Sequence, residues 1–172
     1  MRPRAFIGAM AVAAVSVAGI AWTPASAAGP TTTTCTWGGT PAAPTGTFTM
    51  SPGITNIPAP GPLKFSATGQ LAGDTGCSGT MSFVGQVDAG SSCAMASFEG
   101  IVKGLPGVTR FWGKGTLVVP ELLYDDAGNV VGSDQPQILT EGNSSHFNDC
   151  NTPQGFTGGG FSSLVELSGG LS

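Results

Sequence analysis

Apolar and polar residues alternate along most of the chain after residue 29, and helical spacing of apolar residues is nearly absent. From 63 to 71, every odd position is apolar or glycine and every even position is polar. Such alternation places one set of side chains on each face of a half-buried strand. We therefore expect strands at 63–71, 81–87, 94–102, 111–119 and 161–167, with shorter ones at 47–50 and 137–140.

Turn-forming residues separate these segments, and the turns predict a register. The expected turns lie at 88–91, at 105–108 with Pro and Gly in the central places of a type II turn, and at 125–129. Folding at the first turn places Phe83 opposite Ala96. Folding at the second places Phe98 opposite Gly115, where the glycine leaves room for the ring. All the apolar sets then share one face of a single antiparallel sheet.

This organisation predicts an all-β protein, built as a single antiparallel meander of about seven or eight strands. Closing the meander into a small barrel removes its exposed edges. Glycines inside the strands suit the sharp coiling that a small barrel requires. A β-sandwich is the alternative arrangement.

The first 28 residues have the pattern of a secretory signal peptide. Arg2 and Arg4 precede an uncharged, mostly apolar run, and small residues up to Ala27 and Ala28 fit the cleavage site. The run is shorter than the ~20 apolar residues of a membrane span. We expect cleavage after Ala27 or Ala28, a secreted, extracellular product, and no stable membrane anchor. Residues 29–45 are expected to be an N-terminal extended segment, and 46–172 a single β domain.

Composition narrows the function classes. The chain has six Lys and Arg against ten Asp and Glu, for a formal charge of −4. Loss of Arg2 and Arg4 with the signal takes this charge to −6. So few basic residues do not provide the positive surface that nucleic-acid binding needs. No motif for a cofactor is present, and the mature chain is acidic.

Four cysteines in a secreted chain suggest two structural disulfides, since no C-x-x-C redox spacing occurs. Cys77 and Cys93 fall at opposite ends of the expected 81–102 hairpin, too far apart for a bond. Two pairing schemes remain, and we prefer Cys35–Cys77 with Cys93–Cys150.

The candidates for catalysis are few. His146, the only histidine, could act as a general base beside Ser144 or Ser145 and Asp149. No G-x-S-x-G elbow accompanies it, and a polar loop held by Cys150 is the simpler interpretation. No catalytic residue is therefore assigned, and His146 remains the one candidate.

Four acidic residues lie close together in the sequence: Glu121, Asp125, Asp126 and Asp134. Their carboxylate oxygens are the ligands that Ca²⁺ prefers. The glycine that a calcium loop needs is replaced by valine, and acidic residues are common in turns. We assign no metal site and keep these four as the candidates.

One further group is a candidate binding patch. Trp112 alternates out of phase with the apolar set around Phe111, and the expected register puts it beside Ile101, with Arg110 and Lys114 nearby. If this face is outside, the patch suits a ligand or a surface partner. If it faces inward, the same residues line a polar interior. A Trp112 ring that a loop covers is the third alternative, because large aromatic side chains are usually well buried.

The Ala-rich signal and the strand series from Cys77 to Asp134 resemble small secreted actinobacterial β-rich proteins of unassigned function. The alternating strands with internal glycines also resemble lipocalin-type and allene-oxide-cyclase-type barrels, and this resemblance implies ligand binding. We expect a non-catalytic protein that binds a small apolar ligand or an envelope or surface partner. The alternative is a small barrel hydrolase or isomerase that uses His146 or acidic residues such as Glu121 and Asp134.

Overall fold

The structure is a computed structural model that describes residues 31–116, 120–140 and 149–169. These residues contain no α-helix, so none of them belongs to a helix that could cross a membrane. The strands are β1 Thr32–Trp37, β2 Gly39–Thr40, β3 Ala43–Pro44, β4 Gly46–Ile54, β5 Leu63–Gly73, β6 Thr80–Val87, β7 Ala96–Lys103, β8 Arg110–Gly115, β9 Glu121–Tyr124, β10 Val130–Thr140 and β11 Phe156–Ser168.

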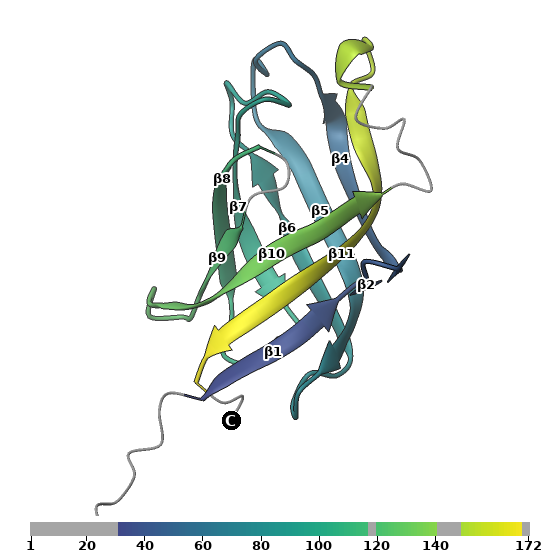
Figure 1. Cartoon of the computed structure of the whole chain (residues 1–172). Helices are drawn as coiled ribbons and strands as arrows, with labels where there is room; N and C mark the ends of the chain where they lie inside the picture. The colour runs from purple at the N-terminus through teal and green to yellow at the C-terminus, as the bar shows by residue number, and fades with distance from the viewer. Residues whose placement is uncertain (1–30, 117–119, 141–148, 170–172) are drawn as a thin grey trace, which may run out of the picture.

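Strands β4 to β11 form a closed antiparallel barrel (Figure 1). Each pairs with the next along the chain, and β11 pairs with β4 through Gly158–Thr49 and Phe161–Gly46 to complete the circle. Closure leaves no free edge between the first and last strands. The barrel expected from the alternation is confirmed, and the sandwich alternative is not adopted.

Strand β1 is an additional strand of the same sheet. It pairs with the second half of β11 from Thr32–Ser168 to Trp37–Ser163, and with the end of β5 through Cys35–Gly73. Figure 1 shows it alongside β11 at the lower end of the barrel. Residues 32–37 therefore belong to the β domain, whereas the expected domain began at residue 46. The proposed signal peptide, 1–28, lies outside the described residues.

Aromatic side chains fill the barrel interior. The Trp37 ring lies 4.5 Å from the rings of both Phe83 and Phe161, and its Nε1 donates a hydrogen bond to the carbonyl of Met81. Phe83 stacks on Phe111 at 4.2 Å. Burying one such ring contributes about 1.5–3 kcal/mol. Phe83, Phe111 and Phe161 occupy the inward positions that the sequence predicts, whereas the inward position of Trp37 was not predicted.

The β7–β8 register differs from the expected one by two residues. Phe98 lies opposite Gly113 rather than Gly115. The Pro106–Gly107 turn forms, but Gly104 (φ +82°) adds a left-handed residue on one side of it. A shift of two residues keeps every side chain on its predicted face, because the strand repeat is also two.

The β6–β7 register differs more. Phe83 lies opposite Val102 rather than Ala96, and β7 begins at Ala96 rather than 94. The turn at 88–91 forms, with Ser91 N bonded to the Asp88 carbonyl. The chain then continues through an irregular segment that holds Cys93 before β7 begins. The sequence predicted that this segment belongs to the strand. The predicted β6–β7 pairing therefore differs from the observed one by six residues.

Two disulfides join Cys35 to Cys77 and Cys93 to Cys150, which confirms the pairing predicted from the sequence. The first ties β1 to the segment after β5, and the second ties the β6–β7 connection to the segment before β11. Closing loops of this length stabilises a fold by about 2–4 kcal/mol per bond. Two such bonds fit an oxidising environment.

Candidate functional site

Two carboxyl groups lie inside the barrel. Glu121 begins β9, and Asp134 is its direct partner on β10. Both side chains take inward positions: Glu121 alternates with the buried Leu123, and Asp134 is 1% exposed. The register therefore brings together two acidic residues that are thirteen positions apart in the chain.

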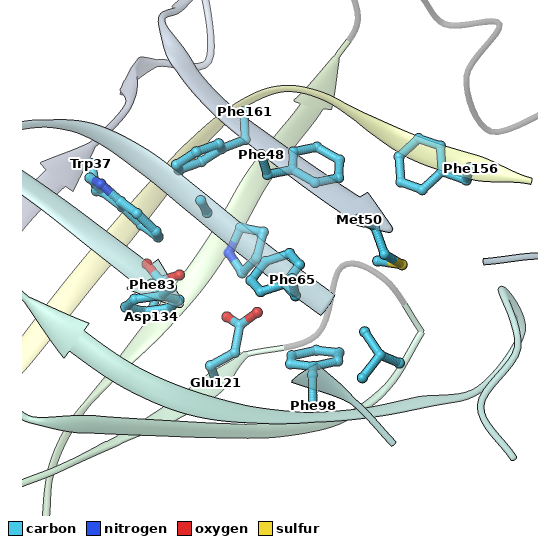
Figure 2. Close-up of a pocket in the computed structure, with 13 residues that line it drawn as sticks. Trp37, Phe48, Met50, Phe65, Phe83, Phe98, Glu121, Asp134, Phe156 and Phe161 are labelled. Atoms are coloured by element: carbon cyan, nitrogen blue, oxygen red, sulfur yellow. The ribbon is translucent and has the colours of Figure 1, made fainter. Parts of the chain in front are cut away.

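Their surroundings are almost entirely apolar. Figure 2 shows the two carboxyl groups pointing toward one another among aromatic rings. They line a cavity of about 50 Å³. One water needs about 10–15 Å³ of such space, so the cavity has room for more than one small polar group. Phe65 lines it and remains only half-buried, although its side chain faces inward. The other lining residues are Trp37, Phe48, Met50, Ala67, Phe83, Val87, Phe98, Pro136, Phe156 and Phe161.

The hydrogen bonds of the pair are incomplete. Ser163 Oγ, from β11, donates to Asp134 Oδ1. The carboxyl groups of Glu121 and Asp134 are hydrogen-bonded to one another. Glu121 Oε2 is buried and has no partner among the described residues. An unpaired buried polar atom costs about 1–3 kcal/mol, so Oε2 marks a place where a donor would be stabilising.

Burial shifts the acidity of both groups. Burial, followed by the charge of Asp134 and the hydrogen bond to it, raises the pKa of Glu121 well above its usual value. Burial also raises the pKa of Asp134 to about 7, while hydrogen bonds from Ser163 and Glu121 act in the opposite direction. Two adjacent carboxyl groups in a dry site cannot both ionise easily. Near neutral pH the pair therefore keeps a proton, and Asp134 is the carboxyl group that ionises first.

Gly113 on β8 makes space for this arrangement. A Cβ at this position would lie 2.4 Å from Phe98 Cε2 and 3.0 Å from Glu121 Cγ. Any side chain there would push the Phe98 ring or the Glu121 side chain out of place. The glycine thus fixes where the ring and the carboxyl group meet.

This arrangement can do two things chemically. It can accept hydrogen bonds from a positively charged or neutral donor, with apolar rings around the rest of the ligand. It can also move a proton, because a carboxyl group with a pKa near 7 is matched to proton transfer at neutral pH.

The four acidic metal candidates do not form one group. Glu121 and Asp134 lie inside the barrel, whereas Asp125 lies in the β9–β10 turn, where its carboxylate accepts hydrogen bonds from the backbone and side chain of Asn129. Those bonds lower the pKa of Asp125. Asp126 is exposed in the same turn. Within the described ranges, no three His, Cys, Asp or Glu side chains are placed to hold one metal ion.

The other sequence candidates lie elsewhere. His146 falls outside the described residues, as do Ser144 and Ser145. Trp112, Ile101, Arg110 and Lys114 all lie on the outer face of β7 and β8, and Trp112 is 39% exposed. Ile101 faces Arg110 across the strands rather than Trp112, which faces Glu99.

Ser163 and the aromatic lining were not identified as site residues from the sequence. Ser163 falls in the inward set with Phe161 and Val165, so the alternation did place it inside. A serine on the apolar side of a strand signals a buried polar partner. Finding that partner requires the β10–β11 register, which local pattern does not supply.

Comparison with protein-family models, curated proteins and solved structures finds no match to this chain. Its function is therefore inferred from its own geometry.

Proposed function

We propose that this chain is a secreted, non-catalytic binding protein that takes a small organic cation into its barrel. The ligand has an apolar body and a primary ammonium group. The ammonium group lies against Glu121 and Asp134, and the body lies among the rings that line the cavity. The observation that carries this proposal is the unpartnered Oε2 of Glu121 beside a second buried carboxyl group.

The energetic penalty of burying two carboxyl groups favours a cationic ligand that pairs with them. Two buried acids without a cation destabilise the folded state whenever they ionise. An apolar pair of similar size would avoid that penalty. Groups that reduce stability in this way are concentrated at functional sites.

The shape and chemistry of the cavity define the ligand class. An ammonium group donates three hydrogen bonds and is compact, whereas a guanidinium or quaternary ammonium group is larger. Aromatic rings such as those of Phe65 and Phe98 also attract a cation at their faces. The volume of about 50 Å³ holds the head group and the first carbons of the ligand. A longer body has to displace Phe65, the half-buried ring of the lining.

The test is a titration of the secreted chain with n-butylammonium at pH 8, followed by calorimetry and by amide NMR shifts. Butyrate and n-butanol are the matched anionic and neutral ligands. We expect butylammonium to bind most tightly and to shift the amides of β9 and β10. Equal binding of butyrate, or no binding of butylammonium, would contradict the proposal.

The variant Asp134→Asn removes the inner carboxyl group that ionises first and should abolish this binding. Glu99→Gln is the matched control, because it replaces a carboxyl group by an amide on the outer face of β7. Loss of binding in both variants would assign the effect to overall charge instead.

Secretion is part of the proposal. It is supported by the signal-like pattern of residues 1–28 and by two disulfides, which form in oxidising compartments. N-terminal sequencing of the protein from culture medium should begin at Ala28 or Gly29. Recovery of the uncleaved chain from cells alone would contradict it.

Proton transfer is the second candidate function, favoured by the pKa of about 7 at Asp134 in a cavity that aromatic rings surround. An isomerase would use Asp134 as the base and the protonated Glu121 as a donor to the developing oxyanion. Exchange of the α-protons of a small ketone in D₂O, measured by NMR, tests this role. Exchange that stops in Asp134→Asn would support it, and exchange at the buffer rate would exclude it for that ketone.

A further inference from the structure

The outer face of the barrel carries a second feature, separate from the interior. A shallow hollow of about 720 Å³ crosses the outer surface from β5 to β9. Its floor lies at Gly85 and Gly100, which are direct partners across β6 and β7 and contribute no side chains. Rows of outward side chains on either side form its walls, including Trp112 and Arg110.

The hollow combines an exposed aromatic ring with planar polar groups. Trp112 lies opposite Glu99, and Glu99 lies opposite Gln86 on the next strand. Tyr124 lies opposite Arg110 on β9. An indole ring, a carboxylate, an amide and a guanidinium group are thus held within one concave surface.

Positive charge is concentrated here on an otherwise acidic chain. After residue 30 the sequence has only four basic residues: Lys64, Lys103, Arg110 and Lys114. Lys64 and Arg110 line the hollow, and Lys114 is the next outward residue after Trp112 on β8. Lys64, Arg110 and Lys114 are all exposed to solvent. These cations are therefore available to a ligand.

Along β8, the cations flank the aromatic ring. Arg110, Trp112 and Lys114 take successive outward positions, about 6.6–7 Å apart. A pyranose ring stacks its apolar C–H face on an indole, and its substituents then project sideways. A carboxylate on the stacked sugar would reach Arg110 or Lys114, and the sugar hydroxyls would reach Glu99 and Gln86.

We propose that this hollow binds an oligosaccharide that contains uronic acid residues. A peptide fits the surface less well, because β6, β7 and β8 are each paired on both sides and offer no strand edge for backbone hydrogen bonds. A neutral glycan would leave the cations beside Trp112 without a partner. The proposal is independent of the interior cation site.

The test is titration of the secreted chain with tetragalacturonate, measured by calorimetry, with cellotetraose as the neutral sugar and poly-glutamate as the non-sugar anion. We expect binding of tetragalacturonate, with cellotetraose at least about tenfold weaker. Absence of binding at about 10 mM tetragalacturonate would overturn the proposal. Equal binding of poly-glutamate would show a site for anions in general and would overturn it too.

Variants locate the site. Trp112→Ala should weaken tetragalacturonate binding by about tenfold or more, and Arg110→Gln by about fivefold. Lys103→Gln is the matched control, since Lys103 is exposed at the end of β7 and does not line the hollow, and should leave affinity within about twofold. Thermal unfolding confirms that each variant folds. Equal losses of tetragalacturonate affinity in all three variants would show that binding is a diffuse attraction between charges. That result would contradict a defined site in the hollow.

Discussion

Glu121 and Asp134 lie directly opposite one another on β9 and β10, with both carboxyl groups inside the barrel and hydrogen-bonded to each other. Ser163 donates to Asp134 from the neighbouring strand, while Oε2 of Glu121 is left without a partner. Because both carboxyl groups are buried, the free energy of unfolding should depend on pH. The oxygen without a partner should favour binding of a ligand that donates a hydrogen bond.

Stability should decrease as pH rises. The pKa of Asp134 is about 7 in the folded state against 3.8 for the free group, so the folded state binds more protons between these values. The free energy of unfolding is then greatest near pH 4 and falls through pH 7, by on the order of 4 kcal/mol for this group. Urea unfolding at pH 5, 6, 7 and 8 measures this change. A urea unfolding midpoint that rises from pH 5 to pH 8 would contradict the claim that these carboxyl groups are buried without a compensating cation.

Asp134→Asn should remove most of that dependence. The neutral amide still accepts the hydrogen bond from Ser163 through its oxygen and carries no charge to bury. We expect the variant to be more stable than the natural chain at pH 8 by about 1–4 kcal/mol, and close to it at pH 5. The same urea series on both proteins makes the comparison. Lower stability of the variant at pH 8 would show that the ionised pair is stabilising.

Ser163→Ala should raise the pKa of Asp134 further. The hydroxyl group donates to the carboxylate and so favours its ionised form. Carboxyl ¹³C NMR titration should show the change, by roughly one pH unit. Ser133→Ala is the control, because Ser133 neighbours Asp134 on β10 but faces the other side of the strand. An unchanged titration in Ser163→Ala would mean that the hydrogen bond does not tune the site.

Gly113→Ala should disturb the interior site. The added methyl group meets the Phe98 ring and Glu121, so we expect a loss of about 1–3 kcal/mol in unfolding free energy and weaker butylammonium binding. Gly61→Ala is the matched control, since a Cβ there meets nothing within 4 Å. If the two variants have the same unfolding free energy and the same butylammonium affinity, Gly113 is not needed to make room for the Phe98 ring and the Glu121 side chain.

Local pattern was sufficient to predict the barrel but not all of its strands. Alternation places Phe65, Phe83 and Phe111 inside before any pairing is known, because the side-chain repeat of a strand is fixed by its backbone. Strand β9 was not predicted, and only 137–140 of β10 was. The additional strand β1 was missed as well. In it, threonines occupy both faces beside Cys35 and Trp37, so the contrast between apolar and polar positions is weak.

The register of the β6–β7 and β7–β8 pairs and the position of the interior site depend on features that the alternation of apolar and polar residues does not contain. The left-handed Gly104 and the irregular segment around Cys93 shifted two pairings from the expected ones. The Glu121–Asp134 pair was considered as an acidic pair, but its burial follows only from closure of the sheet between β4 and β11. Until that closure is known, an acidic residue at an inward position cannot be distinguished from an acidic residue in a turn.

The most direct test of the interior site is the pH dependence of n-butylammonium affinity between pH 5 and pH 8. The ligand stays charged over this range, and Glu121 and Asp134 are the titrating groups that the proposal places against its ammonium group. We expect affinity to rise by about tenfold per pH unit below pH 7, with a proton released on binding, and then to level off. Affinity that is independent of pH, or greatest at pH 5, would contradict binding at Glu121 and Asp134.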